Sequence, residues 1–194
     1  GLDVARFGGD NSALCVRQGN TVLEIQSFAS MDLMQLCGVI KNRYDEATVL
    51  ERPQEILVDV IGIGAGVVDR LREQNLPVRG VNVSESPSSK KNYLNLRAEL
   101  WFAIKDWLAQ RDCRLPNDDE LVAELAAPLY KYTSTGKIKI ESKDEMRKRG
   151  IKSPDKADAL ALTMASSAAS FSGSESVFGY NFKKPLKSRI IRVG

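Results

Sequence analysis

Hydrophobic and polar residues alternate along the first part of the chain, which is the pattern of strands with one buried face. Three short segments separated by turn-forming residues are predicted to be strands: 1–6, which is apolar apart from Asp3, and 12–17 and 21–28, which alternate. The second and third are joined by Gln18, Gly19 and Asn20, a tight turn of hairpin type. We therefore predict that the chain opens as a three-stranded antiparallel meander.

Helical and strand patterns then follow one another, which is typical of parallel pairing. The order is a helix over 31–49, an apolar strand over 55–61, a glycine-rich turn, a helix over 67–74 and a strand over 78–83. The turn glycines match a dinucleotide-binding motif only in part, because Val67 occupies the position of its last glycine. We therefore interpret this segment as a β-α-β unit and not as a nucleotide site.

The rest of the chain is predicted to be helical apart from one hairpin and a tail. We expect one helix over 94–109, a second that ends near 127 and a third from 155 to 164. A hairpin is expected over 129–133 and 137–141. Trp101 and Trp107 in the first of these helices are interpreted as core residues. A small, polar linker and a basic segment end the chain, so we predict a domain over 1–170 and a flexible basic tail over 171–194. The fold class is α/β, with a central mixed sheet flanked by helices.

The composition excludes several kinds of catalytic and metal site but leaves the binding partners open. The 194 residues contain no histidine, which excludes Ser-His-Asp catalysis and histidine-ligated zinc. Three separated cysteines indicate neither a disulfide framework nor a structural zinc site. A net charge of +3 permits a nucleic-acid partner without requiring one. The sequence shows no membrane span and no signal peptide, so we expect a protein that is not secreted.

Four aspartates stand where a carboxylate has no evident structural role. Asp3 and Asp59 interrupt apolar strands, and Asp155 and Asp158 lie three residues apart on one face of a helix rich in small residues. Packed carboxylates repel each other, so a cation is expected between them, and a divalent metal ion fits this position. The alternative is structural: Asp155 would cap the helix and Asp158 would be solvated.

Four segments then form a recognisable series. They are Gly-Leu-Asp-Val-Ala of residues 1–5 with Gly8, Gly9 and Asp10 after it, Val58, Asp59 and Val60 followed by Gly62 and Gly64, Asn-Leu-Arg-Ala-Glu-Leu-Trp of residues 95–101, and Pro-Asp-Lys-Ala-Asp-Ala-Leu of residues 154–160. In this order and spacing the sequence resembles the ribonuclease H-like nucleases, and more closely the C-terminal nuclease domain of the large terminase subunit of tailed bacteriophages. The resemblance spans about residues 1 to 165.

This resemblance implies an endonuclease that cuts concatemeric double-stranded viral DNA with two Mg²⁺ or Mn²⁺ ions. By position, Asp3 matches the first catalytic acid, Asp59 the second, and Asp155 or Asp158 the third, while Asp10 matches an accessory acid of some members. The family pattern often has two adjacent acids where this chain has Pro154 and Asp155. The resemblance also implies an ATPase motor domain upstream of Gly1 and the host cytoplasm as the location. The implied partners are the portal or procapsid, which would bind the tail, and the small terminase subunit as a further candidate.

Basic side chains are candidates for contact with the DNA backbone. Two end a polar loop and four lie just before the acidic helix: Lys90, Lys91, Lys143, Arg147, Lys148 and Arg149. The alternative is that they form a solvated surface. Two other functions also stay open at this point: another ribonuclease H-like nuclease, such as a junction resolvase or transposase core, and a non-catalytic docking domain with structural acids.

Overall fold

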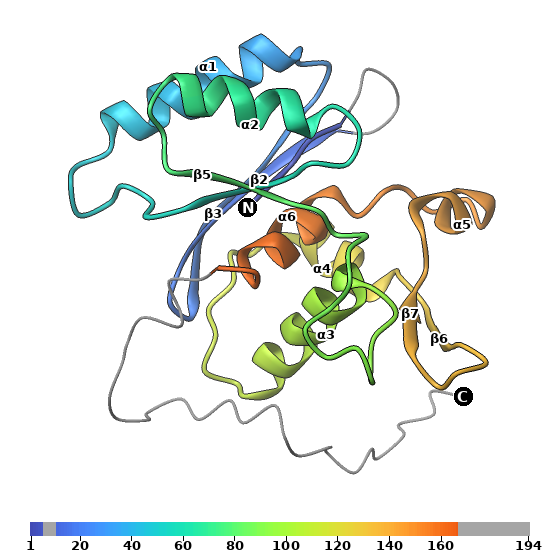
Figure 1. Cartoon of the computed structure of the whole chain (residues 1–194). Coiled ribbons are helices and arrows are strands. Elements are labelled where there is room, and N and C mark those ends of the chain that lie inside the picture. The colour runs from blue at the N-terminus through green and yellow to red at the C-terminus, as the bar shows by residue number, and fades with distance from the viewer. Residues whose placement is uncertain (6–10, 167–194) are drawn as a thin grey trace.

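A five-stranded sheet in the order β3-β2-β1-β4-β5 forms the centre of the molecule (Figure 1). The structure is a computed structural model and describes residues 1–5 and 11–166. The strands are β1 (Leu2–Asp3), β2 (Ser12–Gln18), β3 (Thr21–Phe28), β4 (Ile56–Asp59) and β5 (Val78–Val81). β2 runs antiparallel to β1 and β3, whereas β1, β4 and β5 are parallel. The predicted mixed sheet is confirmed, while Asp10 and the predicted tail lie outside the described residues.

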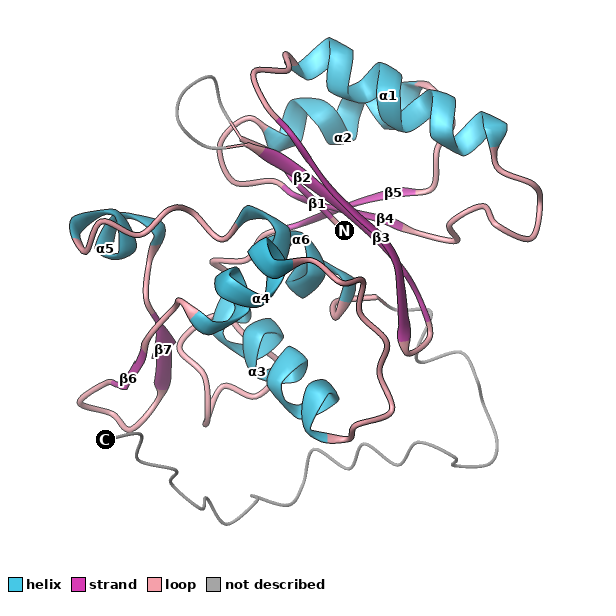
Figure 2. Cartoon of the chain, turned by 180° about the vertical axis from the view of Figure 1, so that it is seen from behind, coloured by secondary structure: helices cyan, strands magenta, loops and turns pink. Residues whose placement is uncertain are grey.

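Helices cover both faces of the sheet (Figure 2). α1 (Leu33–Glu46) and α2 (Gly64–Glu73) lie on one face, and α3 (Leu96–Ala109), α4 (Asp119–Ala126) and α6 (Asp155–Thr163) lie on the other. A separate hairpin of β6 (Tyr130–Tyr132) and β7 (Ile138–Ile140) lies beside α5 (Lys143–Lys148). Within the described part of the chain, no helix combines the length and apolar character needed to cross a membrane.

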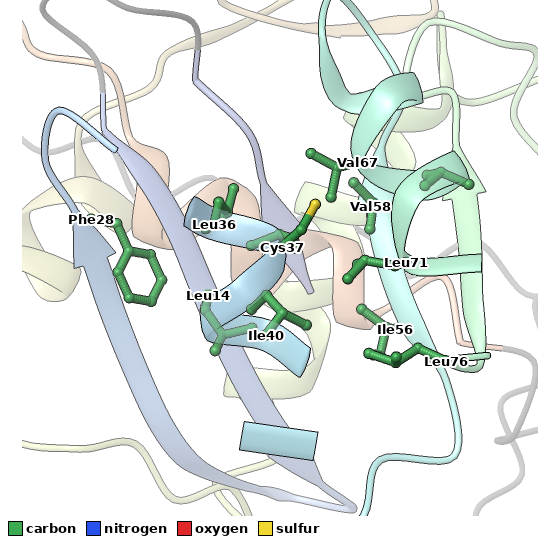
Figure 3. Close-up of a cluster of buried hydrophobic side chains, with 12 residues drawn as sticks. Leu14, Phe28, Leu36, Cys37, Ile40, Ile56, Val58, Val67, Leu71 and Leu76 are labelled. Atoms are coloured by element: carbon green, nitrogen blue, oxygen red, sulfur yellow. The ribbon is translucent and has the colours of Figure 1, made fainter. Parts of the chain in front are cut away.

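The hydrophobic core below α1 and α2 explains which strand residues face which side. Leu14 and Val58 pack there with Leu36 and Ile40 of α1 (Figure 3), and Leu2 belongs to the same cluster. Because successive strand residues point to opposite faces, the neighbours of Leu2 and Val58 along the strands point to the face that α6 covers. Those neighbours include Asp3 and Asp59.

α6 crosses the other face of the sheet at very close range. All nine of its residues are buried, and its alanines pack beside Ala13 and Cys15 of β2. A side chain on Gly1 would place its Cβ 2.0 Å from the Ala159 carbonyl oxygen, so the backbones of β1 and α6 are nearly in contact. The small residues of α6 therefore allow its acidic first turn to approach the end of β1.

The sequence prediction of two helices needs correction. α2 begins at Gly64 and not at 67, because Gly64 starts the helix against the end of β4: a Cβ there would lie 1.7 Å from the Asp59 carbonyl oxygen. α5 was not predicted, since its residues form a highly charged run. It is stabilised by a capping box in which Ser142 and Glu145 satisfy each other's backbone N–H groups.

The first turn of α6 is capped by a neighbouring helix. Its own N-cap residue, Pro154, makes no side-chain capping bond. Instead, the Ala157 N–H donates to Oε2 of Glu124 in α4 over 2.9 Å. Burial of Glu124, with repulsion from Asp155, raises the pKa of this carboxyl to about 7 despite the hydrogen bond. α4 thus holds the turn that carries Asp155.

Gly64→Ala should destabilise the protein by about 1–3 kcal/mol, because the added methyl group must push α2 away from the end of β4. Gly38→Ala in α1 is the matched control, because no atom lies within 4 Å of a Cβ built there. It should instead stabilise by about 0.5–1 kcal/mol through helix propensity. Urea unfolding of both variants measures the difference. Equal effects would show that α2 does not pack closely on Asp59.

Glu124→Gln tests the raised pKa of Glu124 through the pH dependence of stability. A carboxyl whose pKa rises from 4.5 to about 7 on folding stabilises most when protonated, and this contribution is lost as the pH increases through 7. Glutamine resembles the protonated form at every pH. The variant should therefore melt above wild type at pH 8 and at a similar temperature at pH 5. A difference that does not change between pH 5 and 8 would contradict the raised pKa of Glu124.

Candidate metal centre

Two of the four aspartates lie at the ends of adjacent parallel strands. Leu2 of β1 is paired with Val58 of β4. The following residues, Asp3 and Asp59, therefore lie side by side at the carboxyl ends of these strands, and both point to the face covered by α6. Asp3 is buried, and Asp59 is partly buried. This sheet edge is where α/β proteins usually bind ligands.

α6 brings Asp155 and Asp158 to the same edge, and the two carboxylates have different partners. Asp155 accepts a hydrogen bond at Oδ2 from the Asn11 N–H over 3.0 Å. Asp158 accepts at Oδ1 from Trp101 Nε1 over 2.8 Å and from Arg97 Nη2 over 3.0 Å. Both aspartates are buried, so neither is the solvated acid of the structural alternative.

Lys143, the first residue of α5, supplies a positive charge that three of the aspartates share. Its Nζ lies 2.8 Å from Oδ2 of Asp3, 3.3 Å from Oδ1 of Asp155 and 3.5 Å from Oδ2 of Asp158. Burial disfavours the ammonium ion, but attraction to these carboxylates outweighs burial and raises the pKa of Lys143 above its ordinary value. The cation expected between the acids is thus present, and it is a lysine.

Asp3 and Asp59 are held in environments that disfavour their charge. Burial raises the pKa of Asp3 to about 7, and repulsion from Asp158 and Asp155 adds to this effect while Lys143 opposes it. Burial also raises the pKa of Asp59, although its Oδ1 accepts a hydrogen bond from the Ile61 N–H over 3.0 Å. The charges of Asp158, Lys143 and Arg97 also act on Asp59, so Asp59 belongs to the same electrostatic cluster.

The donor set suits a hard divalent cation, but the carboxylates are spaced for an ammonium ion. Among the described residues, no three acidic, cysteine or histidine side chains are arranged to hold a metal ion as they stand. The oxygens lie 2.8–3.5 Å from the lysine nitrogen, whereas Mg²⁺ requires oxygens at about 2.1 Å. Metal binding would therefore require Lys143 to withdraw and the carboxylates to move inward. All-oxygen ligands favour Mg²⁺ or Mn²⁺ over zinc or copper.

The basic residues predicted to contact DNA divide into two groups. Lys90, Lys91 and Lys148 are exposed, and of the three others, which form ion pairs within the molecule, Arg147 and Arg149 are exposed as well. These three are Lys143 in the acid cluster, Arg147 with Asp144, and Arg149 with Glu141.

A buried carboxylate fixes the loop that carries Lys90 and Lys91. Glu99 of α3 accepts hydrogen bonds from the Ser88 N–H over 2.7 Å and from the Ser89 N–H over 3.0 Å. The two lysines follow directly after these anchored residues. Their backbone is therefore held in place, while their side chains remain exposed.

Three functional groups were missed or misinterpreted from the sequence. Lys143 was assigned to DNA binding, although it lies among the acids. Trp101 is buried as predicted, but its indole N–H also orients Asp158. Arg97 was part of the motif on the long helix, and its position four residues before Trp101 was the available signal, because residues at this spacing share a helical face.

Comparison with known proteins yields structural relatives only. No family model matches the chain, and no curated protein matches it. The nuclease domain of the large terminase subunit gp2 of bacterial virus Sf6 superposes with a TM-score of 0.72 at 24% identity, covering 85% of this chain and 86% of that chain. A point mutant of that domain with manganese and beta-thujaplicinol gives 0.73 at 22% identity, with the same coverage.

A second phage provides a more distant relative. The large terminase nuclease from thermophilic phage G20c with bound magnesium superposes with a TM-score of 0.64 at 17% identity, covering 84% of this chain and 78% of that chain. The resemblance drawn from the sequence motifs is thereby confirmed at the level of the fold: the chain has the ribonuclease H-like architecture of phage terminase nuclease domains.

Proposed function

We propose that this chain is a divalent-metal-dependent endonuclease that cleaves double-stranded DNA during viral genome packaging. The observation that carries the proposal is the convergence of Asp3, Asp155 and Asp158 on one ammonium ion beside Asp59. Such a cluster is costly unless it serves a cationic ligand. The fold shared with terminase nuclease domains supports the same conclusion.

Asp3, Asp59, Asp155 and Asp158 would hold two Mg²⁺ or Mn²⁺ ions. Two such ions activate a water molecule and stabilise the leaving oxygen during hydrolysis of a phosphodiester. Manganese in the Sf6 relative, and magnesium and cobalt in the G20c relatives, agree with this class of cofactor. The protein would contribute rigid positions for the carboxylates at the ends of β1 and β4 and on the first turn of α6.

The surrounding residues orient the acids and balance their charge. Arg97 and Trp101 fix the Asp158 carboxylate, and the Arg97 Nη1 also donates to the Glu141 carbonyl oxygen over 2.6 Å. Lys143 offsets part of the negative charge of the cluster when no metal ion is bound, and it would release the carboxylates when an ion replaces it. The same cluster is thereby stable in both states.

The partners follow from the proposed reaction. Lys90, Lys91 and Lys148, which are exposed, would contact the DNA backbone. Residues 1–170 would form the nuclease domain of a large terminase subunit with an ATPase motor upstream. The tail, 171–194, would dock on the portal or procapsid, and the small terminase subunit is a further candidate partner. The reaction would take place on concatemeric DNA in the host cytoplasm.

Two other functions predict different results. A junction resolvase of the same fold would prefer four-way junctions, whereas a headful nuclease should cut linear duplex with little sequence preference. A docking domain with structural acids would bind no Mn²⁺ at this edge of the sheet. The Asp59 hydrogen bond to the Ile61 N–H is the contact that a structural acid would make, so Asp59 is the residue on which to test the difference.

Asp59→Asn should leave the metal-free protein as stable as wild type or slightly more stable. Asparagine keeps the acceptor for the Ile61 N–H and removes a charge that burial disfavours. With Mn²⁺ the order should reverse, since an ion at 100 times its Kd stabilises the folded wild type by about 2.7 kcal/mol. Cleavage should fall by at least about 100-fold, because loss of a residue that only supports a metal ligand already costs up to about 100-fold.

Thermal melts in EDTA and in Mn²⁺, together with cleavage of linear duplex, measure these changes. Asp69→Asn, an exposed acid on α2, is the matched control and should change neither the Mn²⁺ effect nor cleavage. If Asp59→Asn lost stability equally in both conditions and still cleaved DNA, the assignment of Asp59 to the metal centre would be wrong.

Lys143→Met should destabilise the metal-free protein by about 1–3 kcal/mol. Loss of one partner of a buried ion pair costs more, about 3–5 kcal/mol, but the lysine side chain is 32% exposed. Mn²⁺ should then stabilise the variant more than it stabilises wild type, because the ion no longer competes with an ammonium group. Thermal melts over a Mn²⁺ titration measure both effects, with Lys148→Met on the same helix as control. A Mn²⁺ effect equal to that of wild type would refute the competition.

A further inference from the structure

The β6–β7 hairpin places two lysines directly opposite each other. Tyr130, Lys131 and Tyr132 of β6 are paired with Ile140, Lys139 and Ile138 of β7. Lys131 and Lys139 are therefore cross-strand neighbours on one face of the hairpin. Like charges in this position destabilise a sheet unless an anion lies between them. The pairing of Lys131 with Lys139 is therefore unfavourable unless a negatively charged group binds both side chains.

Glu145 of α5 provides that partner, but only in part. Its Oε1 lies 3.3 Å from Nζ of Lys131 and 3.6 Å from Nζ of Lys139. Its Oε2 is used by α5 itself, where it accepts from the N–H and hydroxyl of Ser142. These bonds from Ser142, with the charge of Lys131, lower the pKa of Glu145 to about 2. Two ammonium groups thus share one oxygen of one carboxylate, and a positive charge remains.

The opposite face of the hairpin fixes how the lysines are presented. Tyr130 packs edge to face against Phe102 of α3, at a centroid distance of 5.2 Å, and against Tyr132 at 6.1 Å. The backbone of Ile138 also accepts a hydrogen bond from the Leu94 N–H over 2.9 Å. Tyr130 and the backbone of Ile138 therefore attach the hairpin to the body of the molecule, and the lysine pair lies on the face opposite the tyrosines.

The lysine pair is connected to the acid cluster through α5. α5 carries both Glu145, which binds the lysine pair, and Lys143, which binds Asp3. The hairpin and α5 lie together on one side of the molecule in both views (Figures 1 and 2). The Lys131 side chain is 65% exposed, so it is accessible to a ligand larger than Glu145.

We propose that Lys131 and Lys139 together bind one phosphate of the DNA backbone next to the cleaved phosphodiester, with Glu145 as the group that the phosphate displaces. A phosphodiester carries one negative charge and two unesterified oxygens, so each lysine can donate to its own oxygen. Duplex DNA is favoured as the partner because it presents such groups at regular spacing beside the scissile one. This inference rests on the proposed nuclease function.

The test measures binding of the full chain to a short labelled duplex in EDTA, where no cleavage occurs, over a range of salt concentrations. Lys131→Gln with Lys139→Gln should weaken binding and make the slope of log K against log salt shallower by about one, because one phosphate contact is lost. Glu145→Gln should tighten binding by about two- to five-fold, because the lysines lose a competitor of ordinary ion-pair strength. Glutamine also serves in a capping box, so α5 is preserved.

The matched control is Lys41→Gln with Arg72→Gln. It removes the same charge from α1 and α2 on the other face of the sheet, where each residue pairs with an acid of its own helix. Its salt slope should equal that of wild type. DNA binding with the same slope in the Lys131/Lys139 variant, or weaker binding by Glu145→Gln, would overturn this inference and leave the nuclease proposal standing. No binding by wild type would overturn both.

Discussion

The ammonium group of Lys143 is the interaction on which the candidate site depends. It draws together carboxylates from the first strand and from the last described helix, segments more than 140 residues apart in the chain. Burial removes the water that would otherwise screen their repulsion, so the cluster needs a cation at all times. Because α6 packs closely on β1, little space is left between the carboxylates. The cation there must be small, or it must be able to leave when a metal ion binds. A lysine meets this requirement, because the Lys143 side chain is 32% exposed and can withdraw toward solvent while Met146 keeps α5 packed on the core.

Much of the fold could be predicted from the sequence because the relevant signals are local. The meander and the parallel unit each follow from hydrophobic period and turn residues, and both are present. The start of α2 could not be predicted in this way. Gly64 appeared to belong to a turn, whereas it lies in the helix because β4 leaves no room for a Cβ. For α5 a local signal existed, since Ser142 and Glu145 have the spacing of a capping box, but the dense charge obscured it.

The acids of the site could be identified from the sequence, but most of their partners could not. A carboxylate in an apolar strand is conspicuous at any position, which is why Asp3 and Asp59 stood out. The groups that surround the aspartates are contributed through contacts across the fold. Trp101 lies 57 residues from Asp158 in the chain, and its indole is equally consistent with core packing. Only the three-dimensional arrangement shows that the same ring both fills the core and orients a carboxylate.

The structure also separates the two aspartates of α6, which the sequence left equivalent. Asp158 accepts hydrogen bonds from Trp101 and from two nitrogens of Arg97, in addition to its ion pair with Lys143. Asp155 accepts from the Asn11 N–H and from Lys143. A carboxylate has about four acceptor positions, so Asp155 retains more of its capacity once Lys143 withdraws. This difference favours Asp155, beside Asp3, as the principal third ligand among the four proposed aspartates. Asp158 is held more firmly by the protein, so it would offer the metal ions a carboxylate in a fixed position.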